Sequence, residues 1–213
     1  MQKIPQRTVE RFFRYAQFLH TRLDAGAENV FSRELAAAVG VSPEQVRRDL
    51  MNFDLRGTPQ RGYQIKEFMT ELYLHLESSS LTKMVLVGVG NLGKAILTYF
   101  LHRRPNLSIV AAFDSDQEKA NRVYAGCQIY HASMLEKIVA QEGAAVGIIT
   151  VSAAAAQETA DALVKAGVRG ILNFAPTQLK VPEGIFLEQI DITLSIEKAA
   201  YFARKTALKE HTS

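Results

Sequence analysis

Three glycines near the middle of the chain have the spacing of a phosphate-binding turn. Gly88, Gly90 and Gly93 form a G-x-G-x-x-G motif that follows the apolar run 84–87 and precedes a helical pattern. In such a turn the first glycine permits the sharp bend, the second lets the backbone approach a pyrophosphate, and the third lets the helix pack on the strand. The start of the helix adds free N–H groups and the positive end of its dipole. The motif alone is a weak signal, but this context favours a dinucleotide site.

An acidic residue stands where the ribose of a dinucleotide needs a hydrogen-bond acceptor. Asp114 ends the second apolar run, IVAAFD, twenty-six residues after Gly88. A carboxylate at this place accepts hydrogen bonds from a ribose diol and repels a 2′-phosphate, so we expect NAD(H) and not NADP(H). The alternative is a glycine-rich turn in a sheet that binds no nucleotide. The order of strand, glycines, helix and acid makes that alternative the less favoured one.

The sequence offers no convincing catalytic residues. Tyr201 and Lys205 have the Tyr-x-x-x-Lys spacing of short-chain dehydrogenases, but they lie beyond the last expected strand, where no sheet edge remains to hold a nicotinamide. An exposed helix face is the favoured interpretation of this pair. None of the five histidines follows a strand with an acid placed to orient it, and no metal-ligand spacing occurs. We therefore expect a cofactor-binding sheet that is not an enzyme and holds no metal.

Composition sets wide limits. The 213 residues, 47% hydrophobic and 22% charged, fit one large globular domain or two small ones, and the net charge of +3 is weak support for any partner. A single cysteine, Cys127, excludes an internal disulfide and is expected to be a small core residue. No apolar run reaches the ~20 residues of a membrane span. The N-terminus lacks the apolar segment of a signal peptide. We expect a cytoplasmic protein without a membrane partner.

The segment before the glycine motif has the periodicity of several short helices. Apolar residues at three- and four-residue steps form one face of the first helix. A second helix is expected over 33–39, with Ser32 as its N-cap and Gly40 as its stop. The members of the first helix face are Val9, Phe12, Phe13, Ala16, Leu19 and Leu23.

The third helix has the strongest start signal in the chain. Ser42 is a candidate N-cap, Pro43 occupies the first helical position, and Gln45 stands three residues after the cap. These residue types form a capping box in which the missing N–H of proline costs nothing. Two short helices joined by a tight turn, as over 32–50, indicate a helix-turn-helix.

Basic residues follow this motif and favour DNA as a partner. Arg47 and Arg48 lie on the third helix, and Arg56 and Arg61 lie in the Gly- and Pro-containing stretch 54–65, which predicts a β-hairpin, or wing. Side chains at the capped helix start can reach base edges or phosphates in a groove. The alternative is a helical protein-interaction domain with a solvated arginine pair. The DNA-binding candidates are Ser42, Gln45, Arg47, Arg48, Arg56 and Arg61.

From residue 84 the pattern changes to alternating strands and helices, which predicts a parallel, doubly wound sheet. The expected fold class is α/β: an N-terminal winged helix-turn-helix (1–80), a Rossmann-like sheet (81–190) and a long C-terminal helix (191–213). Strands are expected over 84–87, 108–113, 145–151, 170–174 and 185–190. Further helices are expected over 66–80, 91–103, 133–141 with Ser133 as N-cap, and 153–166.

Five stretches resemble the Rex family of bacterial redox-sensing transcriptional repressors, and together they span nearly the whole chain. They are KIPQRTVERFFRY, VRRDLMNF, GVGNLGKA, ILNFAP and VPEGIFLEQIDI. ILNFAP, at 171–176, is far more specific than the glycine motif. The competing interpretation is an NAD-dependent oxidoreductase with an N-terminal interaction domain.

The resemblance implies a homodimer that exchanges its C-terminal helices, binds double-stranded operator DNA when NADH is low and releases the DNA when NADH binds. It places Val151, Asn173 and Phe174 near the nicotinamide, and makes Tyr99 and Asp191 a polar pair that links the cofactor state to DNA binding. The full set of cofactor-binding candidates is Gly88, Val89, Gly90, Asn91, Leu92, Gly93, Asp114, Val151, Ser152, Asn173 and Phe174.

Three departures from the family pattern bear on these expectations. Gln17 stands where family members often have an arginine that pairs with the acid at the position of Asp191, although Arg14, one turn earlier, could replace it. Ser152 replaces a usual proline and frees one backbone donor near the cofactor. The wing lacks some of the expected glycines and basic residues. The sequence leaves open the operator, the regulated genes and the relative affinities for NADH and NAD⁺.

Overall fold

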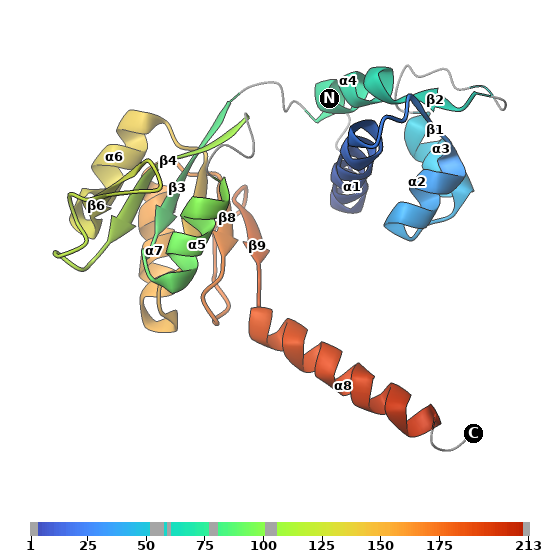
Figure 1. Cartoon of the computed structure of the whole chain (residues 1–213). Coiled ribbons are helices and arrows are strands. Elements are labelled where there is room, and N and C mark those ends of the chain that lie inside the picture. The colour runs from blue at the N-terminus through green and yellow to red at the C-terminus, as the bar shows by residue number, and fades with distance from the viewer. Residues whose placement is uncertain (1–3, 52–57, 59–60, 77–80, 101–105, 211–213) are drawn as a thin grey trace. The chain divides into compact units, whose positions relative to one another are not determined.

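The computed structural model describes residues 4–51, 58, 61–76, 81–100 and 106–210, the last five without their side chains. The chain divides into two compact units, Met1–Ser80 and Leu81–Ser213 (Figure 1). Each unit has its own buried core.

In its described part the first unit is a small helical domain with a two-stranded sheet. Apolar faces of all four helices meet in one core, in which Phe12, Tyr15 and Leu19 of the first helix are fully buried. The periodicity predicted for that helix is confirmed, except that Phe13 is exposed. The elements are α1 (Gln6–Asp24), β1 (Asn29–Val30), α2 (Ser32–Val39), α3 (Pro43–Leu50), β2 (Tyr63–Gln64) and α4 (Ile65–His75).

The turn between α2 and α3 is the predicted helix-turn-helix connection. Gly40 ends α2 in the left-handed region at φ 72°, a conformation that glycine adopts without strain. Ser42 caps α3, because its Oγ accepts a hydrogen bond from the Gln45 N–H at 3.2 Å. The other half of the predicted capping box is wrong, since the Gln45 side chain bonds to Asp49 instead. Ser32 is also not the cap of α2.

The start of α2 is capped in a different way. Phe31 is the N-cap residue, and its backbone N–H donates to Glu34 Oε2 at 2.8 Å. Ser32 already lies inside the helix, so its hydroxyl cannot perform the capping role. A carboxylate three residues after the cap therefore satisfies a backbone donor at this helix start, without help from a serine.

The described part of the wing pairs with an upstream strand. β2 is antiparallel to β1, with Val30 opposite Tyr63. Thr58 and Gly62 exchange both backbone hydrogen bonds, which makes an antiparallel bridge within the stretch predicted as a hairpin. Gly62 has φ 69°, and a Cβ there would overlap the Val30 carbonyl oxygen. Residues 52–57, including Arg56, lie outside the described part of the chain.

The second unit is built on a seven-stranded sheet in the order β5-β6-β4-β3-β7-β8-β9, parallel except for the β5–β6 pair. From the first strand, β3, the chain adds β4 and β6 on one side and β7, β8 and β9 on the other. This is the Rossmann-type order, and its topological switch point lies beside β3. The strands are β3 (Thr82–Val87), β4 (Leu107–Asp114), β5 (Val123–Tyr124), β6 (Cys127–His131), β7 (Val146–Ile149), β8 (Gly170–Asn173) and β9 (Phe186–Gln189).

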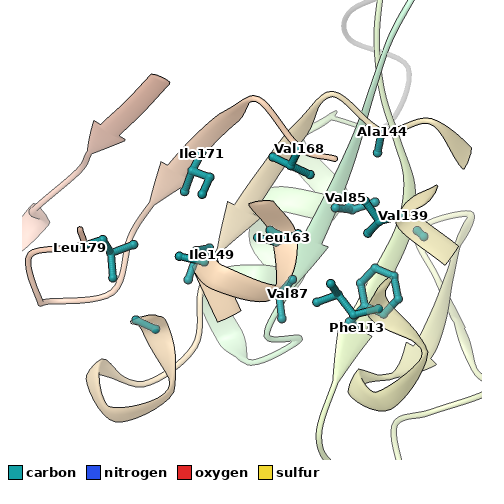
Figure 2. Close-up of a cluster of buried hydrophobic side chains, with 14 of the residues drawn as sticks. Val85, Val87, Phe113, Val139, Ala144, Ile149, Leu163, Val168, Ile171 and Leu179 are labelled. Atoms are coloured by element: carbon teal, nitrogen blue, oxygen red, sulfur yellow. The ribbon is translucent and has the colours of Figure 1, made fainter. Parts of the chain in front are cut away.

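Alternate residues of the strands point to opposite faces of the sheet, as the two-residue period of a strand requires. Val85, Val87 and Ile149 pack with α6 and α7 in one buried cluster (Figure 2). Leu86 and Ile148 pack with α5 on the other face. The helices are α5 (Asn91–Phe100), α6 (Leu135–Glu142), α7 (Ala153–Lys165) and α8 (Ile192–Glu210).

Two local features of this unit differ from expectation. The β5–β6 hairpin was not predicted; it turns at Ala125 and Gly126, with φ 48° and 74°. Ser133 does not cap α6, because it lies in a 3₁₀ turn where His131 Nδ1 accepts its backbone N–H at 3.3 Å. Cys127 is buried as expected, and burial raises the pKa of its thiol to about 11.

The last helix, α8, begins after β9 as predicted and extends away from the sheet (Figure 1). Each of its described side chains is exposed except the half-buried Ala200. Several of the exposed side chains are large and apolar. Among the described helices, none combines the length and apolarity that crossing a membrane requires. The large apolar side chains are Ile192, Leu194, Ile196, Tyr201 and Phe202.

Candidate dinucleotide cleft and nucleic-acid interface

The glycine turn lies between β3 and α5, at the carboxyl edge of the sheet. Gly88 has φ 102°, and a Cβ there would lie 2.6 Å from the Thr150 carbonyl oxygen. A Cβ on Gly93 would overlap the Gly88 carbonyl oxygen. The Thr150 hydroxyl, at the end of β7, donates to that same oxygen at 2.7 Å. The turn is therefore packed tightly on its inner side, where only glycine fits.

Gly90 differs from the other two glycines of the motif. A Cβ on Gly90 would meet nothing within 4 Å, and its backbone is outside the left-handed region. Gly90 is exposed and lines a cleft of about 730 Å³. The protein itself therefore does not require glycine at this position. A ligand that approaches the backbone would require it.

Asp114 ends β4 beside the turn and is almost completely buried. Its Oδ2 accepts the Val89 N–H at 2.8 Å and Lys119 Nζ at 3.1 Å, and its Oδ1 accepts the Asp116 N–H at 2.9 Å. Burial by itself raises the pKa of this carboxyl, but the three donors outweigh burial and leave the pKa below its usual value. A charged acceptor is thus fixed at the rim of the cleft.

Only some of the predicted cofactor-binding residues line the cleft. Gly88, Gly90, Asp114, Val151 and Ser152 line it. The Val89 side chain is instead fully buried in the core under α5, and Gly93 is buried beneath the turn. Asn91 and Leu92 are exposed at the start of α5 and do not line the cleft, and neither do Asn173 and Phe174.

The structure adds lining residues that sequence reasoning missed. Ser115 and Thr150 stand at strand ends beside the switch point, so their place after an apolar run was a usable signal. Lys137 of α6, and Glu158 and Thr159 of α7, also line the cleft. These helix residues lie far along the sequence from the glycines, and no motif marks them.

Asn173 has a structural role in the described chain. Its Nδ2 lies within hydrogen-bond distance of the Ala175 and Thr177 carbonyl oxygens and of Gln189 Oε1, the shortest at 2.7 Å. Its Oδ1 accepts the Ala175 N–H at 3.0 Å. The buried amide therefore fixes the loop after β8 and ties it to β9. Contact with a nicotinamide stays a prediction for Asn173 and Phe174.

The two residues expected to couple the cofactor to DNA binding lie at the surface of the second unit. Tyr99 on α5 is 54% exposed, and its ring meets Phe100 edge-on at 5.5 Å between centroids. Asp191 caps α8, because its Oδ1 accepts the Leu194 N–H at 2.8 Å. Their pairing across a dimer stays a prediction. Tyr201 and Lys205, of the rejected dehydrogenase spacing, are exposed on α8.

The first unit presents a basic face on α3. Arg47 and Arg48 are exposed, and Arg47 forms an exposed ion pair with Glu44 at 2.8 Å. Gln45 is half-buried and donates to Asp49 at 2.9 Å. The other described candidates for DNA contact are Ser42, exposed at the start of α3, and Arg61, exposed at the hairpin. Among the described residues, no group of three or more His, Cys, Asp or Glu side chains could hold a metal ion.

Comparison with known proteins covers both units. A family model described as "Putative DNA-binding protein N-terminus" matches residues 3–50, and one described as "CoA binding domain" matches residues 79–177. Curated relatives named redox-sensing transcriptional repressor Rex include those of Halalkalibacterium halodurans, 40% identical over 95% of both chains, and Leuconostoc citreum, 37% identical over 94% of this chain and 93% of the relative.

Solved structures agree with these relatives over the whole chain. The crystal structure of RSP, a Rex-family repressor, is 28% identical, and the match covers 100% of both chains with a TM-score of 0.86. RSP in complex with β-NAD⁺ and operator DNA matches with a TM-score of 0.87, over 100% of this chain and 98% of RSP. The winged-helix and Rossmann-like fold class predicted from the sequence is thereby confirmed. The chain belongs to the Rex family of redox-sensing transcriptional repressors.

Proposed function

We propose that this chain is a DNA-binding repressor whose affinity for its operator falls when NADH occupies the cleft beside Gly88 and Gly90. One observation carries the proposal: the same chain joins a helix-turn-helix with an exposed arginine pair to a dinucleotide-type cleft at the switch point of a Rossmann sheet. Its relative RSP has been solved with β-NADH and with β-NAD⁺ and operator DNA. Membership of a repressor family sets the oxidoreductase alternative aside. As a regulator of DNA, the protein would act in the cytoplasm.

The cleft would bind the dinucleotide by its pyrophosphate and its adenosine ribose. The turn from Gly88 and the start of α5 supply backbone donors to a pyrophosphate. Asp114 supplies the acceptor for the adenosine ribose. NADH and NAD⁺ share all these atoms and differ only at the nicotinamide. The residues that distinguish the two forms must therefore lie beyond the glycine turn, and Tyr99, Asn173, Phe174 and Asp191 are our candidates.

The exposed apolar side chains of α8 are explained by a second copy of the chain. In a dimer that exchanges this helix, Ile196 and Phe202, each more than 60% exposed in the single chain, would be covered. Burial of apolar surface contributes about 25 cal/mol per Å². We therefore propose a homodimer in which residues 191–213 pack on the partner, as the family resemblance implies.

The decisive experiment compares operator binding in the two cofactor states. A duplex that the wild-type protein selects from a random-sequence pool serves as the operator. At fixed salt, saturating NADH is expected to weaken binding by about 5–150-fold relative to saturating NAD⁺, because allosteric coupling is typically about 1–3 kcal/mol. Equal operator affinity in the two states would end the redox-sensor proposal. Failure to select any duplex would end the DNA-binding proposal itself.

Asp114 is expected to control the choice between NADH and NADPH. In Asp114→Asn, NADH should bind more weakly and NADPH relatively better, by about tenfold in the ratio, because the charge that repels a 2′-phosphate is gone. Lys119→Met is a control with the opposite expected effect. It removes the ammonium group 3.1 Å from the Asp114 carboxylate and should strengthen discrimination against NADPH. Fluorescence titration with both nucleotides measures the ratio. Unchanged ratios in both variants would place Asp114 away from the ribose.

Asp191 is expected to contribute to the switch through its charge as well as its cap. Asp191→Ala should reduce the contrast between operator affinities with NADH and NAD⁺. Asp191→Asn keeps an N-cap but loses the carboxylate. If the contrast falls equally in both variants, the charge of Asp191 contributes to the switch. If it falls in the alanine variant alone, the N-cap contributes. Because Gln17 replaces the expected arginine, the effect should be smaller than that of removing a full ion pair.

A further inference from the structure

The recognition helix α3 carries a buried carboxylate on the face opposite its arginines. Asp49 is 3% exposed and accepts hydrogen bonds from three other side chains. Arg11 of α1 donates from Nε and Nη2, each at 2.7 Å, to the two carboxylate oxygens. The Tyr15 hydroxyl, also on α1, donates at 2.9 Å, and Gln45 Nε2 donates at 2.9 Å from one turn earlier on α3.

This cluster would be costly without its full set of partners. Removing a carboxylate from water is repaid only when the geometry is good and the remaining lone pairs are satisfied. Burial opposes ionisation of Asp49, but the donors hold its pKa below the usual value. Burial and the bond to Asp49 raise the pKa of Tyr15. Asp49 is therefore a carboxylate at neutral pH, and Tyr15 is its neutral donor.

The hydrogen bonds of this cluster fix the rotation of α3, which apolar packing alone does not. Val46 and Leu50 hold α3 on the core, but apolar burial is non-directional and tolerates small rotations of a helix. The two parallel N–H···O bonds from Arg11 to Asp49 have a fixed planar geometry. A rotation of α3 by about 20° would move side-chain tips at a radius of ~5–6 Å by about 2 Å, which breaks these bonds.

We propose that Arg11, Tyr15 and Gln45 form, around Asp49, a positioning network that fixes the rotation of α3 on α1, and that Gln45 serves this network instead of reading bases. The proposal rests on the proposed function, in which α3 enters the major groove. The network turns Glu44, Arg47 and Arg48 outward, since Asp49 holds the opposite face against α1. It acts on selectivity for the operator, because base contacts need closer alignment than phosphate contacts.

The test uses mild variants and a matched control in the full-length protein. Tyr15→Phe removes one donor and keeps the buried ring. Gln45→Met removes the other and keeps the length of the side chain. Leu72→Val, in the same core but outside the network, is the control for reduced stability. For each, the ratio of affinities for the selected operator and a scrambled duplex is measured at fixed salt, together with the salt slope, the melting temperature and NADH affinity.

Both network variants are expected to lower the operator-to-scrambled ratio by about tenfold, with the salt slope and NADH affinity unchanged, whereas Leu72→Val should keep the ratio even at an equal drop in melting temperature. Arg11→Lys, which cannot form the parallel pair of bonds, should resemble Tyr15→Phe. A wild-type ratio in Tyr15→Phe overturns the network. A changed base preference at one operator position in Gln45→Met overturns the assignment of Gln45 and shows that it reads a base. Absence of all selection in the wild type would instead refute the proposed function.

Discussion

Replacing both Arg47 and Arg48 with alanine is expected to abolish selective operator binding and to leave NADH binding unchanged. Both side chains are exposed on α3, on the side away from the core. A bidentate hydrogen-bonded pair between arginine and a base contributes about 1–3 kcal/mol, so removing two such pairs reduces affinity by roughly thirtyfold or more. Where an arginine binds a phosphate instead, each such arginine that is replaced lowers the salt slope of binding by about one unit.

The measurement is operator affinity over a salt series, with NADH titration of the same preparation. Arg169→Ala combined with Lys180→Ala is the matched control, since it removes the same charge from exposed positions of the second unit. A general electrostatic effect would appear in both double variants. Near-wild-type operator affinity in the Arg47/Arg48 variant would mean that α3 is not the recognition helix.

Periodic apolar patterns were enough to predict most of the fold. The five expected strands of the second unit and its main helices all form, because their side chains repeat with the period of a strand or a helix. The β5–β6 hairpin was not predicted, and the reason is chemical. Its turn needs positive φ at two successive residues, and the first of them is Ala125, where asparagine or aspartate is the recognisable signal.

Helix starts were predicted only where residue type and backbone conformation agreed. Ser42 has the extended backbone of an N-cap and performs that role. Ser32 and Ser133 carry the same hydroxyl, but each lies one or more residues inside a helical turn. A hydroxyl group alone does not make a residue an N-cap. The backbone must also place that hydroxyl within hydrogen-bond distance of a free N–H group at the helix start.

The part of the candidate site that belongs to a local sequence motif was predictable. The glycines and Asp114 are recognisable because the strand–turn–helix places them by short-range geometry. Gln45 has no such signal: its partner Asp49 is held by Arg11 and Tyr15, which stand 38 and 34 positions earlier in the chain. Contacts between elements so far apart are set by tertiary packing, and one sequence does not show them.

Alanine at two of the glycines is expected to change the melting temperature differently, although the motif treats the two positions alike. In Gly93→Ala, the new methyl group overlaps the Gly88 carbonyl oxygen, so the turn must shift. We expect both a lower melting temperature of the second unit and loss of NADH binding. In Gly90→Ala, the methyl group meets no protein atom within 4 Å, and the backbone conformation is open to alanine. Its melting temperature should equal that of the wild type.

Gly90→Ala is nevertheless expected to weaken NADH binding. Gly90 lines the cleft, so the methyl group occupies space that a pyrophosphate needs to reach the backbone N–H groups. Removing one such charge-assisted bond costs about 1.5–3 kcal/mol, or roughly 10–150-fold in NADH affinity. The α3 face is unchanged, so the variant should bind operator as tightly as the unliganded wild type and no longer release it at NADH concentrations that clear the wild type. Operator titration over a range of NADH concentrations tests this directly. Release at the wild-type NADH concentration would mean that the dinucleotide does not approach the backbone at Gly90.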